Sequence, residues 1–370
     1  MSAEDFAAEG SGGLLILADL NGSTAFIWKM KSRPKQYSIH LGKRKEQTKM
    51  PKLVMMPPQS ERSRQWAGEI IGQIPQYQVV LPETDEETRG ELADADAVFG
   101  WVPPEMLPLA QKLRWLQSPA AGPKPGFYYQ ELVDHPVEIC NPRGVYNDHI
   151  GQHILMYVLA LARGLPYYMD AQRDQRWDTS AQKSQYIDLT NATALIVGVG
   201  GIGHETARLC RAFGMRVLGI DARWEYEVTE IEKHPPEDLY SLLPEADFVI
   251  VTVPHTPQTE GMWNTKRFKL MKPTAYFINI GRGATTKIED LTQALESGQI
   301  AGCALDVFET EPFPEDHRLW TLPNVLLTPH IAVKDAENIS DRWFALLLDN
   351  AQRFAVGQPL RNIVDKSQWY

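Results

Sequence analysis

Two series of short apolar runs, alternating with polar or helix-like segments, account for most of the chain after residue 50. The first series consists of the runs KLVMM, YQVVLP, ADAVFGW, LRWLQSP and VEICNP. Between the first two lies a helix-like segment, in which Ser60 is a suitable N-cap and Trp66, Ile70 and Ile74 recur at helical spacing. This alternation predicts a small domain built around a parallel sheet.

The second series follows a long helical pattern from Asn147 to Leu165, which Gly164 and Pro166 are expected to end. Its apolar runs are TALIVGVG, MRVLGID, DFVIVTVP, TAYFINIG, GCALDVF and NVLLTPH. Such continuous apolar runs, with helical segments between most of them, are typical of a parallel sheet that is covered on both faces. A last helix is predicted in residues 337–357, ending at Gly357.

The predicted fold is therefore α/β, with two doubly wound parallel-sheet domains. Residues 1–50 are an extension of unknown role.

Composition narrows the class of protein. Of the 370 residues, 43% are hydrophobic and 23% are charged, as in ordinary globular proteins. The formal net charge of −10 argues against nucleic acid or an anionic membrane as the main partner. No apolar run approaches the length of a membrane span. Three widely separated cysteines predict buried thiols in a reducing compartment, without a disulfide framework or a zinc site.

The N-terminal segment contains two opposing signals. Residues 21–45 contain lysine and arginine but no acid, which resembles an organellar transit peptide weakly. The chain nevertheless starts with the acidic MSAEDF, which favours a cytoplasmic protein, with import as the alternative.

A glycine-rich turn follows the first strand of the second series. In GVGGIG, Gly198 allows a tight turn, Gly200 lets a pyrophosphate approach the backbone, and Gly203 lets the next helix pack on the strand. Gly201 and Ile202 lie at the helix N-terminus, where free N–H groups attract an anion. This strand–loop–helix context predicts a dinucleotide site.

Asp221 and Arg223 bear on the choice of cofactor. Asp221 ends the next strand, where a carboxylate accepts hydrogen bonds from the ribose hydroxyls and repels a 2′-phosphate. The position therefore favours NAD. Arg223 could instead bind that phosphate, so NADP stays the alternative.

Three further strand ends carry groups suited to the reduction of a carbonyl. Hydride arrival puts negative charge on the carbonyl oxygen, so the site needs a cation and an acid. Arg282 follows one strand, Glu309 and Glu311 follow the next, and His330 follows the last. All would meet at the carboxyl edge of a parallel sheet, where ligands bind.

These motifs together resemble the D-isomer-specific 2-hydroxyacid dehydrogenase family. GVGGIG, VPHTPQT, NIGRG, ALDVFETEP and TPHIA occur in the family's order, and the resemblance covers roughly residues 51–363. It implies a flavodoxin-like substrate domain in residues 51–147 together with 334–370, and a Rossmann domain in residues 148–333. It also implies an NAD-dependent oxidoreductase, expected to be a homodimer, that interconverts a small 2-keto acid and 2-hydroxy acid. A substrate of the glyoxylate or hydroxypyruvate type is expected.

The resemblance also implies roles for individual residues. Arg282 would bind the carboxylate and keto oxygen of the substrate, and His330 would be the acid in reduction and the base in oxidation. Glu311 would stabilise the protonated imidazole, with Glu309 as the competing acid. The positions expected to contact the cofactor are Asp306 at the nicotinamide carboxamide, Val253, Pro254 and Thr259 on the adenosine side, and Ile280 with Gly281 beneath the nicotinamide.

The segment LQSPAAGPKPG resembles the family's substrate loop, in which N–H groups around Ala121 and Gly122 would hold the substrate carboxylate. Ala120 replaces a usual glycine, and PKPG replaces the usual valine and aspartate, which predicts a stiffer loop. On the following helix Gln152 replaces a usual glutamate. His149 and His153 share one face of that helix, but no third ligand is near them, so no metal site is predicted.

Three other functions remain as alternatives. A phosphoglycerate dehydrogenase-like enzyme is one, although the chain ends at Tyr370 without room for the regulatory domain that many of those enzymes carry. Formate dehydrogenases carry glutamine where Glu311 stands, which disfavours them. An NAD-sensing corepressor-like scaffold is disfavoured because all three catalytic positions are filled.

Overall fold

The computed structural model describes residues 50–122, 126–179, 186–224, 231–334, 336 and 338–369, and the backbone of two short strands nearer the N-terminus. Those strands, β1 (Ile16–Ala18) and β2 (Thr24–Phe26), pair in antiparallel orientation with Ile16 opposite Phe26. Residues 1–49 and 50–370 form separate compact units. The site and its supporting elements all belong to the second unit.

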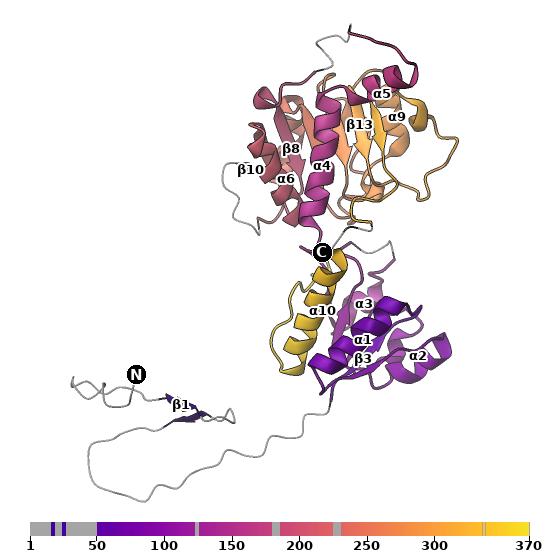
Figure 1. Cartoon of the computed structure of the whole chain (residues 1–370), viewed down its shortest axis with the longest axis vertical. Helices are drawn as coiled ribbons and strands as arrows, with labels where there is room; N and C mark the ends of the chain where they lie inside the picture. Colours follow the sequence, from indigo (N-terminus) through magenta and orange to yellow (C-terminus); the bar gives the residue numbers. More distant parts are fainter. Residues whose placement is uncertain are drawn as a thin grey trace, which may run out of the picture. The chain divides into compact units, whose positions relative to one another are not determined.

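The first series of apolar runs forms a five-stranded parallel sheet (Figure 1). Its strands are β3 (Lys52–Met55), β4 (Gln78–Val80), β5 (Ala97–Phe99), β6 (Trp115–Gln117) and β7 (Glu138–Cys140). The order β4-β3-β5-β6-β7 is the flavodoxin-like order, which confirms the predicted class. Its helices are α1 (Glu61–Gln73), α2 (Asp85–Leu92), α3 (Gln130–Asp134) and α10 (Ile339–Ala355).

Helix α10 packs against the five-stranded sheet, although it lies near the C-terminal end of the chain. Its Trp343 and Leu347 are buried in one cluster with Leu53 of β3 and Trp115 of β6. The Trp343 ring also stacks on Trp66 of α1, with the ring centroids 5.4 Å apart. Burial of these large rings holds the C-terminal segment on the first sheet.

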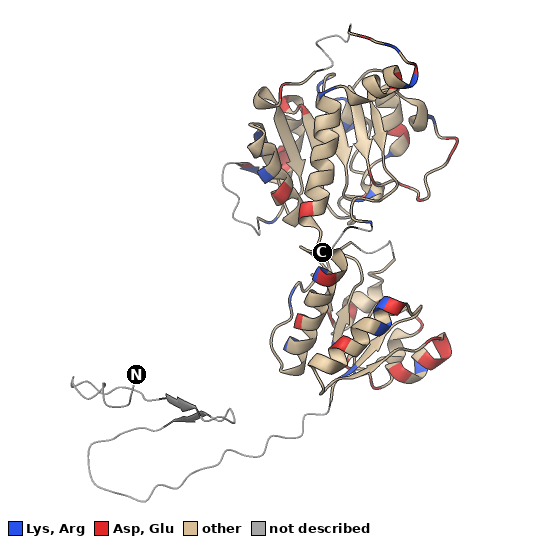
Figure 2. Ribbon diagram, in the orientation of Figure 1, with Lys and Arg blue, Asp and Glu red and all other residues tan. Residues whose placement is uncertain are grey.

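Local sequence signals account for the boundaries of several helices. Ser60 caps α1 as predicted, and it forms a reciprocal capping box with Ser63. The acidic residues of α2 are concentrated in its first turn, where they complement the helix dipole (Figure 2). Gly357, in the left-handed conformation with φ 69°, follows the end of α10.

The second series forms a seven-stranded parallel sheet with the order β10-β9-β8-β11-β12-β13-β14. Its strands are β8 (Thr193–Val197), β9 (Arg216–Ile220), β10 (Glu232–His234), β11 (Phe248–Val251), β12 (Tyr276–Asn279), β13 (Gly302–Leu305) and β14 (Val325–Leu327). The first six follow the Rossmann order, as predicted. Apolar clusters cover both faces, so central strands such as β8 and β11 are buried along their whole length.

Helices lie on both faces of this sheet (Figure 1). They are α4 (Asn147–Ala162), α5 (Leu165–Arg173), α6 (Gly201–Ala212), α7 (Leu239–Leu242), α8 (Thr265–Phe268) and α9 (Ile288–Glu296). Short 3₁₀ turns in this half of the chain are η3 (Leu189–Asn191), η4 (Pro236–Asp238), η5 (Leu243–Glu245), η6 (Gly283–Thr285) and η7 (Arg318–Thr321). A further 3₁₀ turn, η1 (Leu107–Leu109), lies between β5 and β6 of the five-stranded sheet.

Two elements correct the sequence prediction. The single helix expected from Asn147 to Leu165 ends at Ala162, and a second helix, α5, begins at Leu165. Gly164 adopts φ 63° between them, and Pro166 starts the new helix instead of only ending the old one. Strand β10 was not predicted, because its three residues, Glu-Lys-His, are polar and lie at the sheet edge.

The predicted state of the cysteines is confirmed. Cys140, Cys210 and Cys303 are free and buried. Burial raises the pKa of the thiols of Cys140 and Cys210 to about 12 and raises that of Cys303 as well. In the described part of the chain, no helix is both long and apolar enough to cross a membrane.

Candidate active site

The glycine-rich turn connects β8 to α6 and leaves room for a ligand. Gly198 has φ 98°, a conformation that favours glycine. A side chain at Gly203 would collide with the carbonyl oxygen of Gly198, because its Cβ would lie 2.0 Å away. By contrast, a Cβ at Gly200 would meet no atom within 4 Å. Gly200 therefore presents open backbone just before α6 begins, which fits a dinucleotide phosphate, whereas a Cβ at Gly201 would meet the Asn147 side chain at 2.4 Å.

Asp221 lies directly after β9, beside this turn. Its Oδ2 accepts a hydrogen bond from the Val199 N–H at 2.6 Å, and its Oδ1 accepts one from the Arg223 N–H at 2.7 Å. The carboxylate thus braces the phosphate turn and remains at the strand end where a ribose would bind. Hydrogen bonds from Ser367, and more weakly the charge of Arg223, lower the pKa of Asp365. Arg223 therefore lies near a second carboxylate, in the C-terminal segment.

The residues expected on the adenosine and nicotinamide sides come from two neighbouring strand ends. After β11, the Thr259 hydroxyl donates to the Pro254 carbonyl at 2.7 Å and braces the loop that begins at Val253. After β12, Ile280 is buried, and a side chain at Gly281 would collide with the Val253 carbonyl at 2.5 Å. The two loops pack closely, so they form one wall beside the phosphate turn.

Arg282 follows β12 and reaches the loop after β6. Its Nη1 donates to the Gly281 carbonyl at 2.6 Å, and its Nη2 donates to the Gly122 carbonyl. Burial lowers the pKa of Arg282, while the negative charge of Glu311 opposes this shift. A half-buried, charged fork is thus held between the two sheets' loops, where it can bind a carboxylate and an adjacent oxygen.

His330 pairs with Glu311. The His330 Nδ1 lies 2.9 Å from Glu311 Oε2, and Glu311 Oε1 accepts a hydrogen bond from the Phe308 N–H at 3.0 Å. The Glu309 carboxylate has other partners: it pairs with Lys287 Nζ at 3.0 Å and accepts a hydrogen bond from the Ile288 N–H. Of the two acids left open by the sequence, the structure places Glu311 beside the imidazole.

Asp306 is 1% exposed and lies directly after β13. Its carboxylate accepts hydrogen bonds from the Thr328 hydroxyl and from the N–H groups of Ile331 and Ala332. The acid expected to contact the nicotinamide carboxamide is therefore also bound to the loop that carries His330.

The predicted substrate loop follows β6. Ala121 and Gly122 contribute their carbonyl oxygens to contacts with Asn141 and Arg282. Pro123, Lys124 and Pro125, which carry the expected stiffening, lie outside the described residues. Sequence reasoning missed Tyr146, whose phenol accepts a hydrogen bond from Trp343 and lies near enough to Arg282 for each to affect the other's pKa.

His149 and His153 lie on α4, as predicted. His153 Nε2 contacts the Thr328 hydroxyl at 3.2 Å. Burial lowers the pKa of His153, while Asp306 acts in the opposite direction. Among the residues with described positions, no group of three or more His, Cys, Asp and Glu could hold a metal ion.

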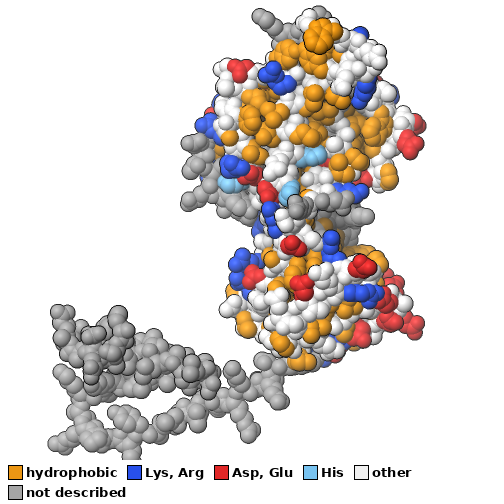
Figure 3. Space-filling view, viewed as in Figure 1, with side chains coloured by type: hydrophobic (Ala, Val, Ile, Leu, Met, Phe, Trp, Pro, Cys, Tyr) orange, Lys and Arg blue, Asp and Glu red, His pale blue; other side chains and the backbone are white. Residues whose placement is uncertain are grey.

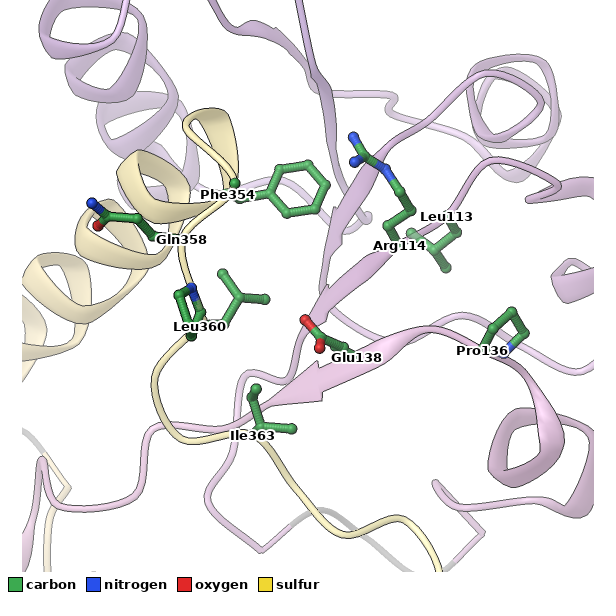
Figure 4. A pocket seen from close by; sticks show the side chains of 10 residues that line it. Leu113, Arg114, Pro136, Glu138, Phe354, Gln358, Leu360 and Ile363 are labelled. Carbon is green, nitrogen blue, oxygen red and sulfur yellow. The ribbon is translucent and has the colours of Figure 1, made fainter.

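A separate pocket of about 540 Å³ lies where the strands β6 and β7 of the five-stranded sheet begin (Figure 4). Its walls come from Arg114, just before β6, from Glu138 at the start of β7, from Phe354 near the end of α10, and from Leu360 in the segment that follows α10. The predicted substrate loop follows the opposite, carboxyl end of β6. This pocket is therefore distinct from the candidate active site.

The fold and the phosphate turn define a dinucleotide-binding protein with two parallel-sheet domains. Residues 155–332 match the family model described as "D-isomer specific 2-hydroxyacid dehydrogenase, NAD binding domain". The chain is 32% identical over 259 residues to a glyoxylate reductase of Thermofilum pendens, covering 68% of this chain and 76% of that protein. The chain belongs to the D-isomer-specific 2-hydroxyacid dehydrogenase family, and its Rossmann domain is an NAD-binding domain.

Two other relatives extend this comparison. A "Probable 2-ketogluconate reductase" of Dictyostelium discoideum is 34% identical over 208 residues, covering 56% of this chain and 62% of that protein. The crystal structure of a family member from Xanthobacter autotrophicus Py2, in complex with NADPH and MES, superposes with a TM-score of 0.76 at 26% identity. That match covers 87% of this chain and all of the other.

Proposed function

We propose that the protein reduces a small 2-keto acid of the glyoxylate or hydroxypyruvate type to the corresponding 2-hydroxy acid. One observation carries the proposal: Glu311 pairs with His330, and its charge also acts on Arg282. A cation for the substrate and an acid for its oxygen are thus linked through one carboxylate at the carboxyl edge of the NAD-binding sheet.

The residues divide the reaction between them. Arg282 binds the substrate carboxylate and keto oxygen, and its charge stabilises the negative charge that develops on that oxygen. When bound, the nicotinamide supplies the hydride. His330 donates its proton to the same oxygen, and Glu311 stabilises the imidazolium from the Nδ1 side. In the reverse direction His330 accepts the proton.

The test is an absorbance screen of 2-keto acids with reduced nicotinamide cofactor. Glyoxylate and hydroxypyruvate should be turned over, and phosphohydroxypyruvate should be the poorer substrate. A clear preference for phosphohydroxypyruvate would favour the phosphoglycerate dehydrogenase-like alternative. Cofactor binding without turnover of any 2-keto acid would favour a corepressor-like scaffold.

NADH should be preferred over NADPH by at least about tenfold in kcat/KM, because Asp221 lies where the 2′-phosphate would bind. Asp221→Asn should narrow this preference, since it removes the repelling charge but keeps an acceptor for the backbone. Arg223→Ala is the matched control. Two results together would show that Arg223 decides the choice of cofactor: the wild-type enzyme uses NADH and NADPH equally, and the Arg223→Ala variant loses activity with NADPH.

Glu311→Gln should lower kcat for keto-acid reduction, because it removes the carboxylate that pairs with the imidazole of the proton donor. Glu309→Gln is the control, because Glu309 pairs with Lys287 instead. The assignment fails if the Glu309 variant has a lowered kcat and the Glu311 variant does not.

We also propose a cytoplasmic homodimer. Free, buried thiols suit a reducing compartment. Hydrophobic side chains gather over α4 and α5 (Figure 3), where Met156, Leu165 and Met169 are each at least 40% exposed and Trp177, just beyond α5, is 96% exposed. An apolar patch of this kind is typical of a surface that binds another protein chain.

A further inference from the structure

The loop that carries His330 has an unusual backbone. His330 adopts φ 53°, in the left-handed region that residues with side chains rarely enter. Its N–H donates to the Thr328 carbonyl at 3.0 Å, which makes a tight turn around Pro329. A side chain in such a conformation keeps its direction only when the surroundings hold the loop.

Asp306 holds this loop immediately after the histidine. Its Oδ1 accepts the Ile331 N–H at 2.9 Å, and its Oδ2 accepts the Ala332 N–H at 3.1 Å. The carboxylate is almost fully buried, so these charge-assisted hydrogen bonds are little weakened by water.

The Thr328 hydroxyl links this carboxylate to α4. It lies 2.5 Å from Asp306 Oδ1, 2.5 Å from the Tyr157 phenol and 3.2 Å from His153 Nε2. A hydroxyl has one hydrogen and two acceptor positions. Because Asp306 can only accept, the Thr328 hydrogen goes to Asp306, and the Thr328 oxygen is left to accept from Tyr157 and His153.

Tyr157 and His153 are well placed for this role. Tyr157 is 1% exposed, and its single phenol hydrogen is shared between the Thr328 oxygen at 2.5 Å and the more distant Leu305 carbonyl, at the end of β13, at 3.2 Å. The His153 ring packs edge-on against the Tyr157 ring, with centroids 4.7 Å apart. A continuous polar chain thus runs from α4 through Thr328 and Asp306 to the two N–H groups that follow His330.

We propose that Thr328 is a positioning residue for His330: its hydroxyl ties Asp306 to α4 and so fixes the left-handed loop that aims the imidazole at Glu311 and the substrate. This inference rests on the proposed function, because it assigns His330 the proton transfer. It predicts that loss of the hydroxyl misdirects the imidazole without removing any group that binds substrate.

The test compares Thr328→Val, which removes the hydroxyl, with Thr328→Ser, which keeps it. Thr328→Val should lower kcat for keto-acid reduction by about tenfold or more, because small misplacements of a proton donor are costly. The KM for the keto acid and the Kd for NADH, from protein fluorescence quenching, should change by less than about threefold. Thr328→Ser should recover kcat to within about threefold of the wild type.

Thr292→Val is the matched control. Thr292 is fully buried in α9, and its hydroxyl donates to the Ile288 carbonyl at 2.8 Å, outside the His330 loop. It should lower the thermal midpoint and leave kcat unchanged. If Thr328→Val does not fold, the Tyr157→Phe variant is measured instead. This substitution keeps the buried ring and removes the phenol that contacts the Thr328 hydroxyl. A fall in its kcat at unchanged KM would support the proposal.

The proposal is overturned if the Thr328→Val variant has the same kcat as the wild type. If Thr328→Val does not fold, an unchanged kcat in Tyr157→Phe overturns it. So does a Thr328→Ser enzyme as slow as Thr328→Val, because the hydroxyl would then not be the cause. The proposed function fails in a different way: the wild type would not reduce keto acids, or His330→Gln would be as fast as the wild type. An active wild type, an inactive His330→Gln and an unaffected Thr328→Val would refute only the role of Thr328.

Discussion

Replacing His330 with glutamine is expected to lower kcat for keto-acid reduction by roughly 10²–10⁴, while the Kd for NADH changes little. Glutamine keeps a polar side chain that can face Glu311, but its amide cannot act as an acid and donate a proton to the substrate. Steady-state rates with the best keto acid, together with NADH binding measured by fluorescence, would check both parts of this expectation.

The control for this substitution is another histidine that pairs with an acid. His234 Nδ1 lies 3.0 Å from Asp238 Oδ2, at the edge strand β10. His234→Gln should retain the wild-type rate. A His330→Gln enzyme that turns over keto acids nearly as fast as the wild type would exclude His330 as the proton donor.

Arg282→Gln should lower kcat/KM for the keto acid by about 10³ or more, with a large rise in KM. It removes both the charge and the planar fork that bind the substrate carboxylate and keto oxygen. Arg282→Lys restores the charge without the fork, so it should recover only part of the loss. The separate effects on KM and kcat, measured over a wide range of substrate concentration, distinguish binding from stabilisation of the developing charge.

Arg342→Gln serves as the control, because Arg342 pairs with Asp148 at an exposed position, with the nearest atoms 2.8 Å apart. Exposed pairs contribute little to stability. Normal activity in Arg282→Gln would mean that the substrate carboxylate is bound elsewhere.

The parallel sheets could be predicted because each central strand is a continuous apolar run. β8 and β11 are buried along their length, so they carry a signal that does not depend on their neighbours. β10 could not be predicted in this way, because an edge strand of polar residues has no apolar pattern. The boundary between α4 and α5 was missed because Gly164 and Pro166 also suit the simple end of one helix.

The candidate site was predictable only as a set of strand ends. Topology brings Arg282, Glu311 and His330 to one edge, which the sequence order already indicates. The choice between Glu309 and Glu311 depends on which way each side chain turns, and that is decided by Lys287 and His330 on other elements. The role of Thr328 depends on a helix far away in sequence, so no local pattern could indicate it.

The three cysteines have a practical consequence for spectroscopy. Alkylating reagents react with thiolates, which are the attacking nucleophiles, and these buried thiols have raised pKa values. The folded native chain should therefore resist iodoacetamide and maleimide dyes, and incorporation should appear only on denaturation. A cysteine introduced at Trp177, which is 96% exposed, would then carry a fluorophore at a single defined position without removal of any native thiol. Measurable labelling of the unaltered folded protein would show that one of the native thiols becomes accessible in solution.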